Sequence, residues 1–138
     1  MVSMTGSTAT STKPKKHGAG SGEAAAVFAA VEALATFMAD FEPGRYEPED
    51  SALLLSAFDR GERLCGAGKT LAVTRVAQAH PHRRTGHRSP AEWFAAQTGA
   101  GMSEAIDQLK LGEALASQPE VEEALRAGNI SVELGFLI

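Results

Sequence analysis

The sequence predicts an all-α protein, with five or six helices in an irregular bundle around one long central helix and a disordered N-terminal tail. Alanine is abundant and β-branched residues are sparse, which favours helix over strand. Proline and glycine fall mainly between stretches in which apolar residues recur with helical spacing. The 138 residues, 43% of them hydrophobic, suffice for one domain. We expect that domain to occupy residues 23–138.

The first 22 residues are rich in Ser, Thr, Gly and Lys and contain few apolar residues. Such a stretch buries too little surface to offset its ordering entropy, so residues 1–22 are predicted to be a disordered tail. A first helix is expected from about Glu23 to Phe41, before the helix-breaking sequence EPGRYEP at 42–48. Its apolar stripe, with spacings of four and three, consists of Val27, Val31, Leu34, Met38 and Phe41.

A second, longer helix is expected from about Pro48 to Ala79. Proline is tolerated in a first turn, and the acids Glu49 and Asp50 suit the positive end of the helix dipole. One stripe along this helix consists of small residues in its second half, which would let another helix approach closely. That stripe consists of Leu54, Phe58, Gly61, Cys65, Gly68 and Ala72, and a neighbouring stripe of Ala57, Leu64 and Leu71. Two adjoining stripes indicate that the helix is central.

Several short helices should follow the polar connection at 80–88. The segment from Ser89 to Glu92 is a capping box with proline in the first turn, and the helix that it begins carries Trp93 and should end near Gly99. A further start is expected at Ser103, a third at Pro119 and a last one at Ser131. Met102, Ala105, Ile106 and Leu109 are predicted to face inward. The helix that begins at Pro119 contains Val121 and Leu125, with Gly128 as its C-terminal stop.

The cellular location is predicted to be the cytoplasm. A single cysteine, Cys65, excludes an internal disulfide framework and a cysteine-rich zinc site. The KPKK sequence at 13–16 precedes an apolar run at 24–39, an order typical of a signal peptide. However, Glu23 opens the run and Glu32 interrupts it, and its length is short for a membrane span. We therefore expect neither a signal peptide nor a membrane partner.

Charge is strongly segregated along the chain. The net charge is −4, yet the interval from Arg63 to Ala91 contains six Lys or Arg residues, three His residues and no acid. Such clusters are typical of phosphate contacts, which give affinity without sequence readout. A solvated loop that pairs with acidic helices is the alternative. The candidate nucleic-acid-binding residues are Arg75, Arg83, Arg84, His87 and Arg88.

The other motifs do not support an active site. GAGKT at 66–70 resembles a phosphate-binding loop, but position 63 is Arg63 where that motif has glycine, and a helix rather than a strand precedes it. The histidines at 80, 82 and 87 do not have the paired spacing of zinc ligands. No GxSxG, HExxH or HNH pattern occurs in the sequence. We therefore expect no cofactor, no metal and no enzymatic activity in this chain.

One stretch of sequence resembles a known family. Residues 85–131 are similar to the actinobacterial domain of unknown function 222, also called the 13E12 repeat family, whose Gly, aromatic or His, Arg-Ser and Glu-Trp run is matched here. Residues 62–77 resemble the family's long helix, and the similarity spans about 48–134. The matching residues are Gly86, His87, Arg88, Ser89, Glu92, Trp93, Thr98, Gly99, Leu115, Pro119, Ala124, Leu125, Gly128 and Ser131.

In that family the helical domain usually precedes a C-terminal HNH nuclease domain, which carries the metal and the catalytic histidine. The resemblance thus implies association with an HNH nuclease domain, and it supplies no ligand sites. The chain ends in Phe136, Leu137 and Ile138, and we expect the domain to be incomplete there. The leading hypothesis is a non-catalytic helical module that contacts DNA non-specifically. The alternatives are a protein-interaction or oligomerisation module that binds another helical protein, and a gene remnant without selected activity.

Overall fold

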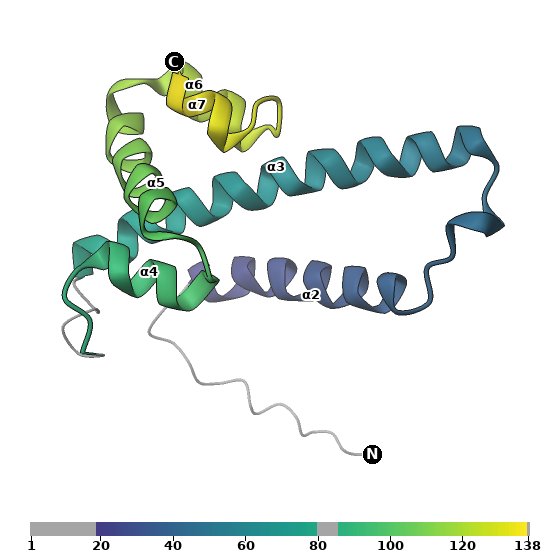
Figure 1. Cartoon of the computed structure of the whole chain (residues 1–138), viewed down its shortest axis with the longest axis horizontal. Helices are drawn as coiled ribbons and strands as arrows, with labels where there is room; N and C mark the ends of the chain where they lie inside the picture. The colour runs from purple at the N-terminus through teal and green to yellow at the C-terminus, as the bar shows by residue number, and fades with distance from the viewer. Residues whose placement is uncertain (1–18, 80–85, 138) are drawn as a thin grey trace. The chain divides into compact units, whose positions relative to one another are not determined.

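The fold is all-α, as predicted. The structure is a computed structural model, and it describes residues 19–79 and 86–137. The described residues form six α-helices and two 3-10 turns and contain no strand (Figure 1). The predicted tail lies largely outside the described residues, but its end was misplaced, because helix begins at Ala19 rather than at Glu23. The chain divides into two compact units, Met1–Tyr46 and Glu47–Ile138. A single domain over residues 23–138 stays a prediction.

The first unit consists of helix α2 (Ala19–Ala39) and the 3-10 turn η2 (Pro43–Arg45). Three aromatic rings gather where α2 ends: Phe37 lies 5.2 Å from Phe41, and Phe41 lies 5.8 Å from Tyr46, centroid to centroid. The apolar stripe of α2 is exposed, with Val27 at 62% and Phe28 at 69% relative exposure.

By length and composition, residues Gly22–Ala39 could cross a membrane, and none of them is buried. The sequence argument against a span on length counted residues 24–39. That argument is wrong because α2 has 21 residues.

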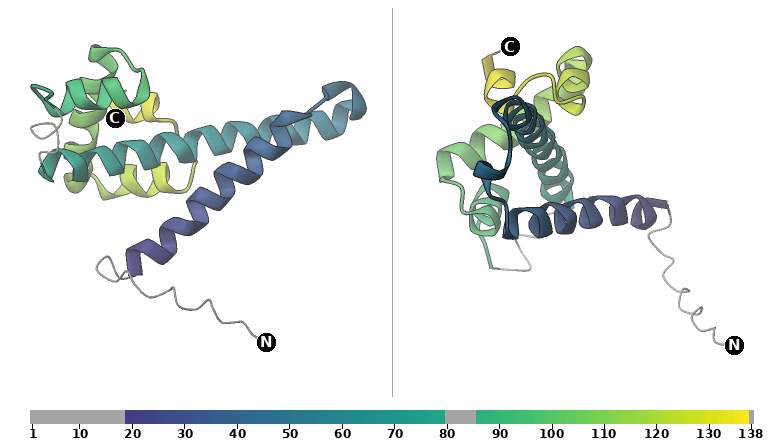
Figure 2. Two further views of the ribbon diagram at one scale, coloured as in Figure 1. Left: turned by 90° about the horizontal axis from the view of Figure 1, so that it is seen from below. Right: turned by 90° about the vertical axis from the view of Figure 1, so that its right-hand side faces the viewer.

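The second unit is built on helix α3 (Pro48–Ala79), whose bounds are those predicted. The other helices of this unit lie around its C-terminal part (Figures 1 and 2). The small stripe predicted to receive another helix is largely exposed, since Cys65, Gly68 and Ala72 all face solvent. The buried residues of α3 are instead Ala67, Thr70 and Val73. The close approach is supplied by glycine on the partner helix, where a Cβ on Gly112 would overlap Thr74 Oγ1.

The remaining elements are α4 (Pro90–Thr98), α5 (Met102–Ala114), η4 (Leu115–Ser117), α6 (Pro119–Arg126) and α7 (Val132–Leu137). They form two apolar clusters against α3. One cluster comprises Ala67, Leu111, Leu115, Val121, Leu125 and Val132. The other comprises Val73, Ala91, Phe94 and Ala105, with Trp93 packed against it. Val121 and Leu125 are the buried residues of α6, and the predicted burial of Ala105 is confirmed.

Most of the predicted helix ends are confirmed. Gly99 caps α4 in the left-handed conformation at φ 79°, and Ser131 Oγ accepts a hydrogen bond from Leu134 N at 3.1 Å. Two expectations about α5 were wrong. The helix begins at Met102 without a side-chain cap, so Ser103 is not the cap. Met102 and Ile106 are exposed, because the buried face of α5 carries Ala105, Gln108, Leu111 and Gly112.

The turn between α6 and α7 has a Schellman-type geometry. Asn129 N donates to Ala124 O at 3.0 Å, and Gly128 N donates to Leu125 O at 3.0 Å. Gly128 adopts φ 76°, which L-residues with a side chain rarely accept. The turn exposes its last carbonyl groups toward α3, and two arginines of α3 bind them.

Candidate nucleic-acid interface

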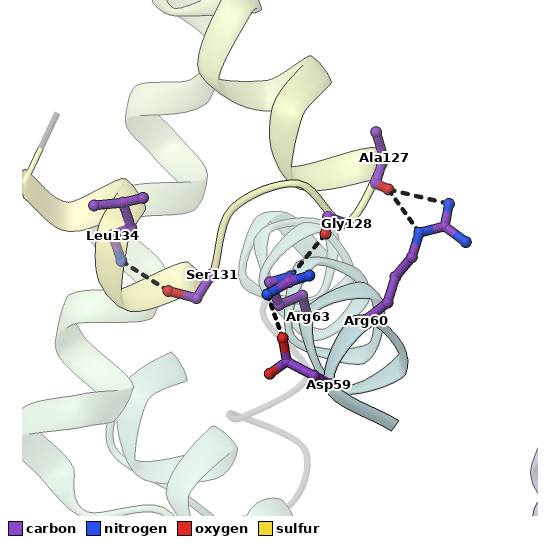
Figure 3. A network of polar contacts seen from close by, with 7 residues as sticks. All are labelled: Asp59, Arg60, Arg63, Ala127, Gly128, Ser131 and Leu134. Carbon is purple, nitrogen blue, oxygen red and sulfur yellow. Dashed lines mark hydrogen bonds and ion pairs between the residues drawn. The ribbon is translucent and has the colours of Figure 1, made fainter. Parts of the chain in front are cut away.

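Arg60 and Arg63 hold the fold together through the turn after α6 (Figure 3). Arg60 donates from Nε and a terminal nitrogen to Ala127 O, at 3.3 and 3.2 Å. Arg63 Nε donates to Gly128 O at 2.7 Å, and its guanidinium also pairs with Asp59. Arg63 opens the basic interval of the sequence, yet its donors are used inside the protein. This agrees with its absence from the candidate residues chosen from the sequence.

The basic residues that follow Arg63 on α3 do not bind carbonyl groups or carboxylates of the described protein. Lys69 and Arg75 are exposed, and neither makes a hydrogen bond or ion pair with another described residue. A solvated cation without an internal partner can exchange its water for a phosphate oxygen at little cost. The candidates Arg83 and Arg84 lie outside the described residues, within the gap at 80–85.

His87 and Arg88 are brought together at the start of α4, around an acid. Arg88 N donates to Glu92 Oε1 at 2.8 Å, and His87 Nδ1 lies 3.4 Å from the same oxygen. Ser89 Oγ accepts from Glu92 N at 3.1 Å, which confirms the predicted N-cap. The reciprocal bond from Glu92 reaches Arg88 N, one residue earlier than a standard capping box.

The negative charge of Glu92 affects which groups can bind near the start of α4. The hydrogen bond from the Arg88 amide, with smaller contributions from His87 and the Arg88 charge, lowers the pKa of Glu92 below its ordinary value. The carboxylate is therefore charged at neutral pH and faces His87. The imidazole of His87 is half-buried beside it, whereas the side chain of Arg88 extends into solvent. Arg88 is thus the better placed of the two for a phosphate.

The GAGKT segment is helical along its whole length, inside α3. Its amides take part in helical hydrogen bonding and cannot form the loop that wraps a phosphate. Thr70 is fully buried, and its hydroxyl donates to Gln108 Oε1 of α5 at 3.1 Å. This buried pair escaped the sequence analysis because Thr70 and Gln108 are 38 positions apart.

Two concave surfaces of the described residues are lined by several acids. Two adjoining clefts of about 450 Å³ each lie between α3, α5 and the start of α7. Their linings share Glu104, Gln108 and Glu133, and further acids line each of them. Among the described residues, no three His, Cys, Asp or Glu side chains come together in an arrangement that could hold a metal. Arg63 and Lys69 also line the second of these clefts, whereas Arg75 and Arg88 line neither of them.

The fold and this surface define a class: an all-helical protein with a cationic stretch on one helix and the following connection. No protein-family model, curated protein or solved structure matched the chain in the three comparisons. The resemblance to the 13E12 repeat family therefore stays a prediction, carried by the residues that match its pattern.

Proposed function

We propose that this chain is a non-catalytic helical module that binds DNA through phosphate contacts of its basic interval, alongside an HNH nuclease domain as the family resemblance implies. The contact residues are Arg75, Arg83, Arg84 and Arg88, and Lys69 joins them on the structure. His87 is a weaker candidate because it lies against Glu92.

This proposal rests on the observation that some arginines bind groups of the protein itself, whereas others have no partner among the described residues. Arg60, Arg63 and Arg126 bind carbonyl groups or carboxylates of the protein itself. Arg75, later on α3, is exposed and has no such partner among the described residues. Side chains that stabilise the fold are thus separated along α3 from side chains that are available to a ligand. Phosphate contacts require the second kind.

The proposal predicts modest affinity for DNA, little dependence on sequence and a steep dependence on salt. We would measure fluorescence anisotropy of labelled DNA over a range of salt concentrations. Replacing Arg83 and Arg84 by alanine removes two phosphate contacts and should lower the salt slope by about two units. The matched control is Lys110→Ala, which removes an exposed cation of α5 from outside the interval. Absence of binding at low salt, or equal effects of the two changes, would refute the proposal.

A second candidate function is self-association through α2. Its stripe of Val27, Val31, Leu34 and Met38 follows the spacing of a coiled-coil seam, and all four side chains are 47–62% exposed. Glu32 lies off this stripe and could remain solvated in a helix pair. We propose a second copy of the chain as the partner, since identical stripes are complementary in size.

The composition of α2 favours a helix partner over a bilayer. Val, Leu and Phe each contribute about −0.3 to −0.6 kcal/mol to membrane insertion, whereas an acid near the centre costs roughly 2.5–3.5 kcal/mol. Glu32 therefore offsets the five Val, Leu and Phe residues of the window Gly22–Ala39. Light scattering should detect a dimer that Leu34→Glu dissociates, with Ala29→Glu, on the opposite side of α2, as the control. A monomeric wild-type chain would exclude this candidate.

A further inference from the structure

A small apolar cleft opens between α3 and α4, with the basic residue Lys69 in its lining. It has a volume of about 150 Å³. Val73 and Val76 line it from α3, Phe94 and Trp93 from α4, with Lys69 and Gln97 also in its lining. Phe94 is 4% exposed and forms part of the apolar core, whereas Trp93 is half-buried. The cleft therefore offers an accessible aromatic surface that is backed by well-packed residues.

The volume of the cleft limits what can enter it. Pockets for drug-sized ligands are about 300–1,000 Å³, so this cleft is too small for such a molecule. An apolar cavity of about 150 Å³ accepts one benzene-sized ring. The six-membered ring of a pyrimidine matches that size, whereas the second ring of a purine would extend beyond the cleft into solvent.

Charge separates this cleft from the others. Each of the three other cavities described in the protein has at least one carboxylate in its lining, such as Glu113 or Glu104. No acid lines the cleft beside Trp93. Lys69 lines this cleft and also the acidic cleft at the start of α7, so the two clefts share this cation. An aromatic wall with a cation at its edge is the arrangement that binds the base and phosphate of one nucleotide.

We propose that this cleft receives an unpaired pyrimidine base against Trp93, with Lys69 on the adjoining phosphate. The proposal rests on the proposed function, and it specifies single-stranded nucleic acid as the ligand. In a duplex the bases are stacked and paired, so placing one in the cleft would require it to be flipped out at a cost. In a single strand that cost is much smaller.

Trp93 is the one tryptophan of the chain, so its emission reports on this cleft alone. We would titrate the protein with oligothymidylate and with a duplex, following Trp93 emission and the anisotropy of the labelled DNA together. Oligothymidylate should quench Trp93 in parallel with binding, whereas the duplex should bind without quenching. Oligoadenylate should quench less. Binding of oligothymidylate without quenching would overturn this proposal and leave the proposed function intact, while a lack of any DNA binding would overturn both.

Variants test the same cleft without relying on emission. Trp93→Leu keeps an apolar side chain but removes the stacking surface, and should weaken oligothymidylate binding by roughly tenfold or more, with duplex binding unchanged. Because Trp93 also contacts the core, a second variant fills the cleft from the exposed residue Ala72, which also lines it. Ala72→Leu should have the same effect while the melting temperature stays unchanged. Ala96→Leu, on the exposed face of α4 and outside the cleft lining, is the control. Unchanged oligothymidylate affinity in Ala72→Leu would refute the proposal.

Discussion

Gly112 and Gly68 are both helical glycines, but their surroundings differ completely. Gly112 is buried where α5 meets α3, and a Cβ added there would overlap Thr74 Oγ1 and lie 3.2 Å from Thr70 O. Thr74 Oγ1 donates to that same carbonyl at 3.0 Å, so it cannot rotate away without losing the bond. Gly68 is exposed on α3, and nothing lies within 4 Å of its added Cβ. The same substitution should therefore have opposite effects at the two positions.

The change in the free energy of unfolding is the sum of two opposing contributions, helix propensity and overpacking. Alanine in place of glycine in a helix interior is favourable by about 0.8–1.0 kcal/mol, and Gly68→Ala should gain about that much stability. Gly112→Ala has the same gain, but overpacking typically costs about 1–3 kcal/mol. Because the overlap involves a backbone carbonyl and a hydrogen-bonded hydroxyl, we expect the upper part of that range. The net loss for Gly112→Ala is then roughly 1–2 kcal/mol.

Urea unfolding followed by helical circular dichroism measures both variants. The midpoint should rise for Gly68→Ala and fall for Gly112→Ala, with similar slopes. Combining Gly112→Ala with Thr74→Ala removes the overlapping hydroxyl and should restore part of the loss, so the two changes should not be additive. The reasoning would be refuted if both single variants moved the midpoint in the same direction, or if the double variant lost the sum of its parts.

Two further predictions concern local contacts of the second unit. Gly128→Ala forces a side chain into φ 76° and places its Cβ 3.1–3.2 Å from Leu64 and Arg60 atoms, so we expect a loss of about 1–3 kcal/mol in urea unfolding; a loss below a few tenths would contradict this account. Glu92 has a lowered pKa in the folded protein, so its carboxylate stabilises the fold at neutral pH, and this contribution disappears as the pH falls through the lowered pKa. The melting temperature of Glu92→Gln should therefore be below that of the wild type at neutral pH and approach it in acid, whereas a constant difference would exclude the linkage.

Local chemistry made much of the fold predictable from the sequence. Pro48 with two acids behind it marks the start of α3, and Ser89, Gly99 and Ser131 mark the ends of other helices through their caps. Each of these signals depends on residues within one turn of each other. The structure confirms these signals, but the start expected at Ser103 is not confirmed, because α5 begins at Met102 without a side-chain cap.

It was harder to predict which side of each helix packs against the core. On α5 the pattern predicted that Met102, Ala105, Ile106 and Leu109 face inward. Ala105 is buried and Leu109 packs against the core, but Met102 and Ile106 are exposed, because Gly112 permits close approach to α3 and Gln108 bonds to Thr70. These are specific contacts between residues that are far apart in the sequence. The spacing of apolar residues within one helix does not predict such contacts.

The candidate site shows the same limit. The sequence gives the number of cations in the interval from Arg63 to Ala91, but it does not show which of them have partners. Arg63 binds the carbonyl of Gly128, 65 residues away, and no local pattern marks that contact. Arg83 and Arg84, which carry much of the expected charge, lie outside the described residues. The candidates Arg75, Arg83, Arg84 and Arg88 were chosen from the sequence, and the structure adds that Arg63 has partners within the protein whereas Arg75 has none among the described residues.

Arg63 and Arg75 provide the sharpest test of that assignment, because they lie on the same helix and carry the same charge. Arg63→Ala removes a charged hydrogen bond of 2.7 Å to Gly128 O, and should destabilise the fold by about 1.5–3 kcal/mol in urea unfolding. Arg75 is exposed and has no partner among the described residues, so Arg75→Ala should change stability by no more than about 0.5 kcal/mol. DNA binding, measured where both variants are folded, should show the reverse: Arg75→Ala should lower the salt slope by about one unit and Arg63→Ala should leave it unchanged. If both arginines contributed equally to DNA binding, the division of α3 into a structural part and a ligand-binding part would be wrong. The basic interval would then act as a diffuse charge whose individual partners within the fold do not matter.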